Sequence, residues 1–132
     1  MSSELFWLAL TVAMTGLFWV PYILDRIMVR GLMGAMANPS PSDKAQSPWA
    51  RRMMDAHTNA VENLVIFAPL VLMTRALGIA TAVTAFACAL YFWSRLVHVV
   101  VYTLGIPVLR TLSFAGGFVA QVLLVLAIFK LI

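Results

Sequence analysis

Four long apolar stretches constrain the fold of this chain more than any other feature. A transmembrane helix needs about 20 predominantly apolar residues, and stretches of about that length run from Leu5 to Leu24, Ala56 to Leu77, Ile79 to Leu104 and Leu112 to Ile132. The chain is 63% hydrophobic and only 11% charged, whereas soluble domains are about half apolar and a quarter charged. The sequence therefore predicts an all-α membrane protein, a four-transmembrane-helix bundle in which residues 1–132 form a single domain.

Charged residues are concentrated in the connection between the first and second spans. That connection carries five basic residues, Arg26, Arg30, Lys44, Arg51 and Arg52. Since basic connections tend to stay in the cytoplasm, we expect the first and third connections there and both termini on the opposite side. The cations flank membrane spans and no platform of aromatic and basic residues accompanies them, which argues against nucleic-acid binding.

Residues with turn and capping chemistry mark the connections. Ser47 precedes Pro48, which predicts a helix N-cap followed by proline at the first helical position. The helix from Pro48 to Leu77 would be longer than the bilayer core is thick, so its first turns should stand outside the membrane. Gly78 predicts a tight hairpin into the third span, and the single cysteine, Cys88, is expected to be a packing residue.

Two of the spans carry polar residues at helical spacing. In the second span Arg52, Asp55, Asn59 and Glu62 follow one another at steps of three, four and three, which predicts one polar face. In the third span Tyr91, Arg95, His98 and Tyr102 recur at steps of four, three and four. Because a cation facing lipid is costly, Arg95 should point into the protein or a wet cavity.

These polar residues should meet near one membrane surface. The second span begins, and the third span ends, on the side to which Arg26, Arg30 and Arg110 also belong. One interpretation is a Glu62–Arg95 ion pair that fixes helix register, although a buried pair is weak evidence for stability. The alternative is a functional anion site, because the cations exceed the acids and intramembrane ionisable groups mark functional sites. For Arg26 and Arg30, contact with lipid headgroups and binding of another anion are both consistent with the sequence.

The combination of motifs resembles the MAPEG family, membrane-associated proteins in eicosanoid and glutathione metabolism. The resemblance spans nearly the whole chain and rests on Ala37-Asn38-Pro39, the run Asp55-Ala56-His57-Thr58-Asn59-Ala60-Val61-Glu62-Asn63, Arg95-Leu96-Val97-His98 with Tyr102, and Arg110-Thr111. It is similar to short bacterial members. The resemblance implies a homotrimer in the inner membrane that binds glutathione between subunits on the cytoplasmic side.

The resemblance also implies roles for individual residues. The expected cofactor-binding residues are Arg30, Asn59, Glu62, Arg95, His98 and Tyr102, and the expected catalytic residues are Arg110 and Thr111. Thr58 and Phe114 stand where some members have an arginine and a tyrosine. No metal site is predicted. The implied activity is transferase or peroxidase chemistry of glutathione on a lipophilic electrophile that arrives from the bilayer.

Elementary chemistry supports this assignment of roles. Only the thiolate attacks, and a free cysteine thiol has a pKa of about 8.5, so a nearby guanidinium such as that of Arg110 raises the reactive fraction. Arg30 suits a carboxylate of the tripeptide, and Glu62 suits its ammonium group. Two alternatives stay open: a non-catalytic protein that binds an anionic lipid or other small anion in the same pocket, and a small exporter that uses Glu62.

Overall fold

The computed structural model describes residues 1–132, and its regular elements are all helices. They are α1 (Ser3–Leu17), α2 (Trp19–Met36), α3 (Pro48–Ala76), α4 (Ala82–Leu104) and α5 (Pro107–Ile128). Helices α1 and α2 continue one another, so the chain has four helical segments long and apolar enough to cross a membrane. This confirms the predicted all-α architecture, and the protein is an integral multi-pass membrane protein.

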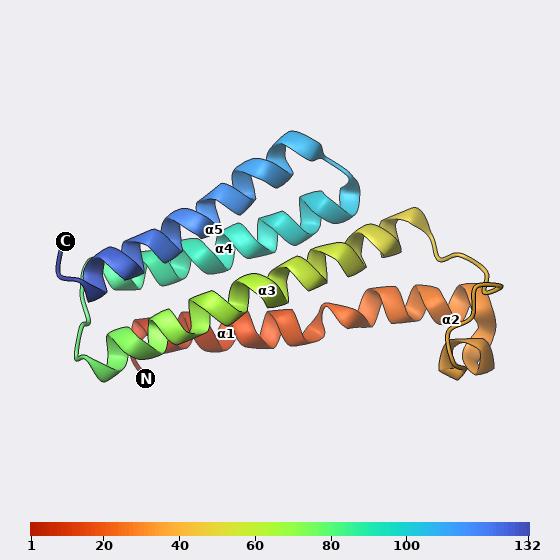
Figure 1. The fold of residues 1–132 in the computed structure, drawn as a ribbon, viewed down its shortest axis with the longest axis horizontal. Coiled ribbons are helices and arrows are strands. Elements are labelled where there is room, and N and C mark those ends of the chain that lie inside the picture. Colours follow the sequence, from red (N-terminus) through yellow and green to blue (C-terminus); the bar gives the residue numbers. More distant parts are fainter.

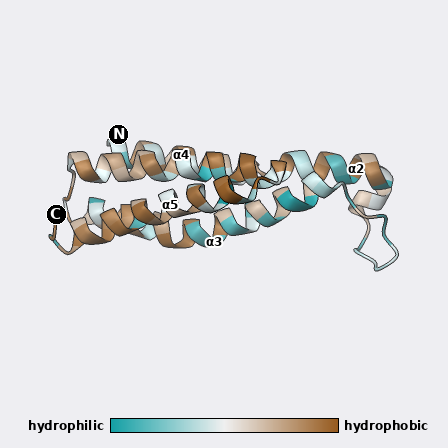
Figure 2. Cartoon of the chain, turned by 90° about the horizontal axis from the view of Figure 1, so that it is seen from above, coloured by the Kyte–Doolittle hydropathy of each residue, from teal (hydrophilic) through white to brown (hydrophobic).

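The helices run lengthwise beside one another in alternating directions. Both termini lie at one end of the molecule, and the α2–α3 connection lies at the other, beyond the α4–α5 turn (Figure 1). Hydrophilic residues gather toward the end with the α2–α3 connection, where α2 ends and α3 begins (Figure 2). The predicted separation of a polar end from an apolar end is therefore confirmed.

The first span, predicted from Leu5 to Leu24, lies within α1 and α2, which together contain two irregularities. The chain turns slightly at Phe18, the residue between α1 and α2, and α2 contains a break at Gly31. Gly31 has φ 73°, ψ 166°, a backbone conformation that residues with a Cβ rarely adopt. The final turn of α2 consequently runs across the bundle direction (Figure 1). The ends of the other helices differ only slightly from the predicted ends of the spans. For instance, the third span was predicted to begin at Ile79, but α4 begins at Ala82 because Thr81 and Thr84 form a capping box.

The start of α3 has the predicted residues at its cap and first helical position, but the cap makes different contacts. Pro48 occupies the first turn as expected, and Ser47 stands at the N-cap position but makes no side-chain capping bond. Its hydroxyl instead donates to Asp25 Oδ1 at 2.5 Å, and its backbone N–H donates to Asp25 Oδ2 at 3.1 Å. Gln46 Nε2 also donates to Asp25 Oδ2, at 3.2 Å. The buried carboxylate thus holds the end of the connection against α2, a contact that local sequence patterns do not reveal.

Close packing between α4 and α5 fixes the part of the bundle that positions the site. A Cβ placed on Gly116 would lie 2.5 Å from Ser94 Oγ, and one on Gly117 would lie 3.4 Å from Arg95 Cδ. Small residues at this contact let the helices approach closely. Farther along, the rings of Phe67 and Tyr91 stack at 3.7 Å with an angle of 5° between their planes, within the main apolar core. Cys88 is fully buried in that core, as predicted.

Candidate functional site

A pocket of about 210 Å³ lies where α3, α4 and α5 meet near the α4–α5 turn. It is lined by Asn59, His98, Tyr102, Arg110, Thr111 and Phe114. Five of these six were predicted as site residues from the sequence, and they come from three helices. The sixth, Phe114, was singled out in the sequence only because some members of the family that the chain resembles have a tyrosine at this position.

Arg95 lies behind this pocket and is held by an amide. Its side chain is 1% exposed, and its Nη2 donates to Asn59 Oδ1 at 2.6 Å. The same Nη2 lies 3.4 Å from His98 Nδ1, while Arg95 Nε is buried without a hydrogen-bond partner. The interpretation of Arg95 as one half of an ion pair with Glu62 is wrong, because the only ion pair in the structure joins Arg30 and Asp43.

Aromatic rings form much of the wall around His98. The imidazole is 2% exposed, and its ring centre lies 5.5 Å from that of Tyr102 and 6.1 Å from that of Phe114. The Arg95 guanidinium carbon lies 5.9 Å from the Phe114 ring centre. Phe114 therefore lies beside the deeper cation without supplying a polar group.

Arg110 and Thr111 lie in the first turns of α5, which begins at Pro107. The Arg110 guanidinium carbon lies 4.9 Å from the centre of the Tyr102 ring, a distance at which a cation–π contact is favourable. The Thr111 hydroxyl donates to the Pro107 carbonyl at 3.3 Å. This long bond to its own helix leaves the oxygen at the pocket wall, where a bound group can compete for its proton.

The predicted polar face of α3 is divided between two sides of the helix. Arg52 and Asn59 contact α4, whereas Asp55 and Glu62 are exposed. Glu62 lines a different pocket, of about 330 Å³, together with Tyr22, His57, Thr58 and Val61. Glu62 is therefore not brought to the pocket that contains Arg110.

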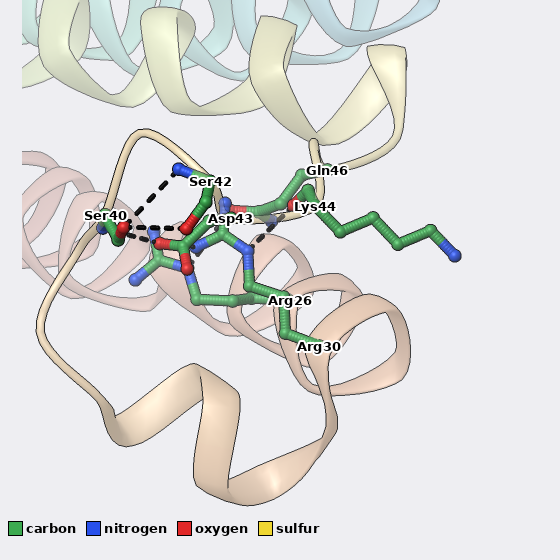
Figure 3. A network of polar contacts seen from close by, with 7 residues as sticks. All are labelled: Arg26, Arg30, Ser40, Ser42, Asp43, Lys44 and Gln46. Carbon is green, nitrogen blue, oxygen red and sulfur yellow. Dashed lines mark hydrogen bonds and ion pairs between the residues drawn. The ribbon is translucent and has the colours of Figure 1, made fainter.

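Arg30 also lies apart from this pocket. Its Nε donates to the Lys44 carbonyl at 2.9 Å, and its Nη1 lies 3.6 Å from Asp43 Oδ2. Nearby, Arg26 Nε donates to Gln46 Oε1 at 3.1 Å. Figure 3 shows these side chains holding the α2–α3 connection against α2. Arg30 thus binds the α2–α3 connection.

Arg52 is a cation of the predicted polar face of α3 to which the sequence analysis gave no binding or catalytic role. Its Nε donates to the Thr103 carbonyl at 2.9 Å, which ties the start of α3 to the end of α4. Arg52 lines a second pocket, of about 260 Å³, that shares Tyr102 and Arg110 with the first. The predicted polar face already grouped Arg52 with Asn59, seven residues or about two helical turns away, and both side chains contact α4.

The electrostatics of the first pocket favour an anion. Arg110 lines it and Arg95 lies directly behind it, and none of its six lining residues is acidic. Two guanidinium groups beside low-dielectric walls attract a negatively charged group more strongly than they would in water. The hydroxyls of Tyr102 and Thr111 add hydrogen-bonding capacity. No group of three or more metal-ligating side chains occurs in the structure.

Comparison with known proteins identifies one family. The sequence model of the MAPEG family matches residues 5–130. The match includes all four spans and both pockets that contain Arg110. Comparisons with curated protein sequences and with solved structures give no significant match.

Proposed function

The chain belongs to the MAPEG family, which includes glutathione-dependent transferases and peroxidases as well as non-catalytic members, and from this premise we propose that it is a glutathione-dependent membrane enzyme. The proposed chemistry is transfer of glutathione to a lipophilic electrophile, or peroxidase chemistry of the same thiol. We treat residues 1–132 as one functional domain. The observation that carries the proposal is the convergence of Arg110, Thr111 and three of the predicted binding residues, Asn59, His98 and Tyr102, on one pocket without an acidic side chain.

The proposed role of Arg110 is to favour the glutathione thiolate. At neutral pH only a few per cent of an unperturbed thiol is ionised. When the glutathione thiol ionises, its proton passes to water. The guanidinium stays charged and stabilises the sulfur anion. Contact with the Tyr102 ring at 4.9 Å limits where the guanidinium can move. The Thr111 hydroxyl would exchange its 3.3 Å bond to Pro107 for one to the sulfur.

Conjugation then requires only an electrophile beside the sulfur. The thiolate attacks an electrophilic carbon, an S–C bond forms, and the leaving group departs with its bonding electron pair. Phe114 is 39% exposed, and it lines the pocket as an apolar residue of α5. An apolar substrate dissolved in the bilayer can approach along this side without crossing water.

We infer that the complete site is formed between copies of the chain in a homotrimer. The pocket of about 210 Å³ is smaller than the roughly 300–1,000 Å³ of typical small-ligand sites, so one protomer supplies only some of the walls. Glu62 and Arg30, which lie elsewhere in the protomer, could reach the ligand from a neighbour. Glu62 is exposed and has no ion-pair partner, as expected for a side chain that binds the ammonium group of the tripeptide.

The orientation of the site follows from the distribution of charge. The end that contains the α2–α3 connection and the α4–α5 turn also carries most of the basic residues. By the positive-inside tendency we place this end, and the site, on the cytoplasmic side of an inner membrane. Glutathione would then enter from the cytoplasm while the electrophile enters from the lipid.

Two measurements test the proposal. The first is calorimetric titration of the purified protein in nanodiscs with glutathione. The second is conjugation of glutathione to 1-chloro-2,4-dinitrobenzene by wild type, Arg110→Ala and the control Arg51→Gln, whose side chain lies outside both Arg110 pockets. We expect saturable binding and a loss of about 10²-fold or more in rate for Arg110→Ala alone, the order typical of a lost electrostatic stabiliser. Equal rates for Arg110→Ala and wild type would refute the activation mechanism.

One observation favours a second candidate, a non-catalytic protein that binds a small anion in this pocket. The pocket combines the Arg110 guanidinium with the Tyr102 and Thr111 hydroxyls and contains no acidic side chain, and these groups can bind an anion whether or not a reaction follows. Saturable glutathione binding with no conjugation or peroxidase turnover by wild type would select this candidate.

A further inference from the structure

The last turn of α2 leaves the direction of the membrane span. From Ser3 to Arg30 the chain runs helically through α1 and α2, which is about 42 Å at 1.5 Å per residue and more than the hydrocarbon core of about 30 Å. Gly31 then breaks the helix. Residues 32–36, which we call the terminal turn, run across the bundle direction beyond this break (Figure 1). The terminal turn therefore begins where the span has crossed the core and reached a membrane surface.

The terminal turn has one face of large apolar residues and one face of small residues. Leu32, Met33 and Met36 are 58%, 76% and 65% exposed. With 3.6 residues per helical turn, these three side chains fall within an arc of about 100°. Gly34 and Ala35 fall on the opposite side and are partly buried. Every large side chain of the terminal turn thus lies on its exposed face.

The face of small residues packs against α2 and the basic side chains near its end. A Cβ placed on Gly34 would lie 3.0 Å from Arg30 Cβ, so the terminal turn lies close against Arg30. Ala35 lines a pocket of about 330 Å³ together with Arg26, Arg30 and Arg51. Guanidinium groups therefore lie on the side of the small residues, opposite the apolar face. Helices that lie in a membrane surface combine a basic side with an apolar side in this way.

The exposed apolar face continues the surface of the membrane span. Leu24 and Met28 are one helical turn apart on α2 and are 55% and 86% exposed, so no element of the bundle covers them. The terminal turn prolongs this apolar surface past the core and then runs across the span direction. It consequently reaches the boundary between acyl chains and headgroups, where long basic side chains near the end of a span extend toward water.

We propose that the terminal turn is an interfacial anchor, which lies in the plane of the bilayer surface at the polar end of the bundle. Leu32, Met33 and Met36 insert among the acyl chains just below the headgroups. The anchor holds one end of the α2–α3 connection at the membrane surface, while the hydrogen bonds of Asp25 hold the other end. Anchoring requires no glutathione, so it is independent of the proposed function.

Spin labels on single cysteines test the depth of the anchor. The background is Cys88→Ala, because Cys88 is the only native cysteine. In phosphatidylcholine nanodiscs a nitroxide at Met33→Cys should collide more often with oxygen, which concentrates among acyl chains, than with a water-soluble nickel chelate. A label at Ser42→Cys, in the exposed connection, should show the opposite preference. Labels at Leu32→Cys and Met36→Cys should report equal depths, whereas a helix that rises out of the membrane would separate them by about 6 Å.

Three results of the labelling would overturn the inference. Preference of the Met33 label for the nickel chelate would place the terminal turn in water. Protection of that label from both reagents would show that protein, such as a second copy of the chain, covers the apolar face. Different depths at Leu32 and Met36 would show that the turn does not lie in the plane of the surface.

Hydrogen exchange tests the anchor without a label. In the double variant Met33→Ser, Met36→Ser, amide hydrogens of residues 32–46 should exchange about tenfold faster than in wild type, because the bilayer no longer holds the terminal turn. The matched control Met33→Leu, Met36→Leu keeps the apolar face and should exchange like wild type. Equal exchange in the serine and leucine variants would also overturn the inference.

Discussion

Arg95 Nη2 donates to Asn59 Oδ1 at 2.6 Å, and this hydrogen bond joins α4 to α3 behind the candidate site. The guanidinium is 1% exposed and has no carboxylate partner. An amide oxygen therefore takes the place that a sequence-based interpretation gave to Glu62. Because no counter-ion neutralises Arg95, its charge remains available to attract an anion into the pocket lined by Asn59 and His98.

Removing the Asn59 amide should destabilise the bundle. Asn59→Leu leaves the buried Arg95 guanidinium with an unmet donor, which costs about 1–3 kcal/mol. Thermal unfolding in detergent should therefore show a lower midpoint. Thr58→Ala, at an exposed neighbouring position, serves as the control and should unfold like wild type. If Asn59→Leu unfolds at the wild-type temperature, the hydrogen bond contributes nothing to stability.

The contact between Gly116 and Ser94 should make α5 intolerant of one added methyl group. In Gly116→Ala the new Cβ would lie 2.5 Å from Ser94 Oγ, and overpacking of this kind costs about 1–3 kcal/mol. The double variant Ser94→Gly, Gly116→Ala should recover part of the loss. Gly16→Ala is the control because nothing lies within 4 Å of the Cβ it would gain. Gly16 is helical, next to the last residue of α1, so its replacement by alanine should be neutral or stabilising. Equal effects of the two alanine variants on the unfolding temperature would contradict this packing argument.

Asp25 should control how firmly the start of α3 is held. It accepts hydrogen bonds from the Ser47 hydroxyl, the Ser47 backbone N–H and the Gln46 amide. Asp25→Ala should therefore increase amide hydrogen exchange across residues 45–50 by about tenfold or more, since a lost hydrogen bond to a charged group is worth about 1.5–3 kcal/mol. Lys44→Ala should leave exchange unchanged, because only the backbone of Lys44 is bonded, to Arg30. Unchanged exchange in Asp25→Ala would show that other contacts hold this segment.

The ring of Tyr102 should matter more for glutathione binding than its hydroxyl. The Arg110 guanidinium carbon lies 4.9 Å from the ring centre, and such contacts contribute about 0.5–2 kcal/mol. Tyr102→Phe keeps the ring and should change glutathione affinity less than about twofold, whereas Tyr102→Leu should weaken it several-fold. Calorimetric titration of both variants makes the comparison. Equal losses would mean that the hydroxyl contacts the ligand directly.

Mixed oligomers should show whether neighbouring copies share one site. Glu62→Gln and Arg110→Ala alter side chains that lie in separate pockets of one protomer, and each variant alone should be inactive. Co-expression of differently tagged copies should restore part of the conjugation activity, because some interfaces then combine an intact Glu62 with an intact Arg110. Tandem purification isolates the mixed complexes. Failure to recover any activity in them would refute a shared site.

Much of the fold followed from the sequence because a bilayer leaves a chain few options. Backbone groups in hydrocarbon must be satisfied within the segment, so long apolar stretches have to become helices. The lengths of those stretches set the number of spans. Helical spacing also placed His98 and Tyr102 on one face of α4, and Asn59 on the face of α3 that meets it. The sequence thus determined the spans, the polar end of the bundle and five of the six residues that line the pocket containing Asn59 and Arg110.

Tertiary structure decided which of these polar residues meet. Helical spacing fixes a face of α3 but not how far α4 and α2 reach around it, so the sequence could not show that Asn59 binds Arg95 while Glu62 faces another pocket. Contacts between residues distant in sequence decide which polar side chains meet. The small side chains of Gly116 and Gly117 let α5 approach α4, and the Thr103 carbonyl fixes Arg52. Such contacts depend on helix rotation and on depth of packing, which no local periodicity encodes.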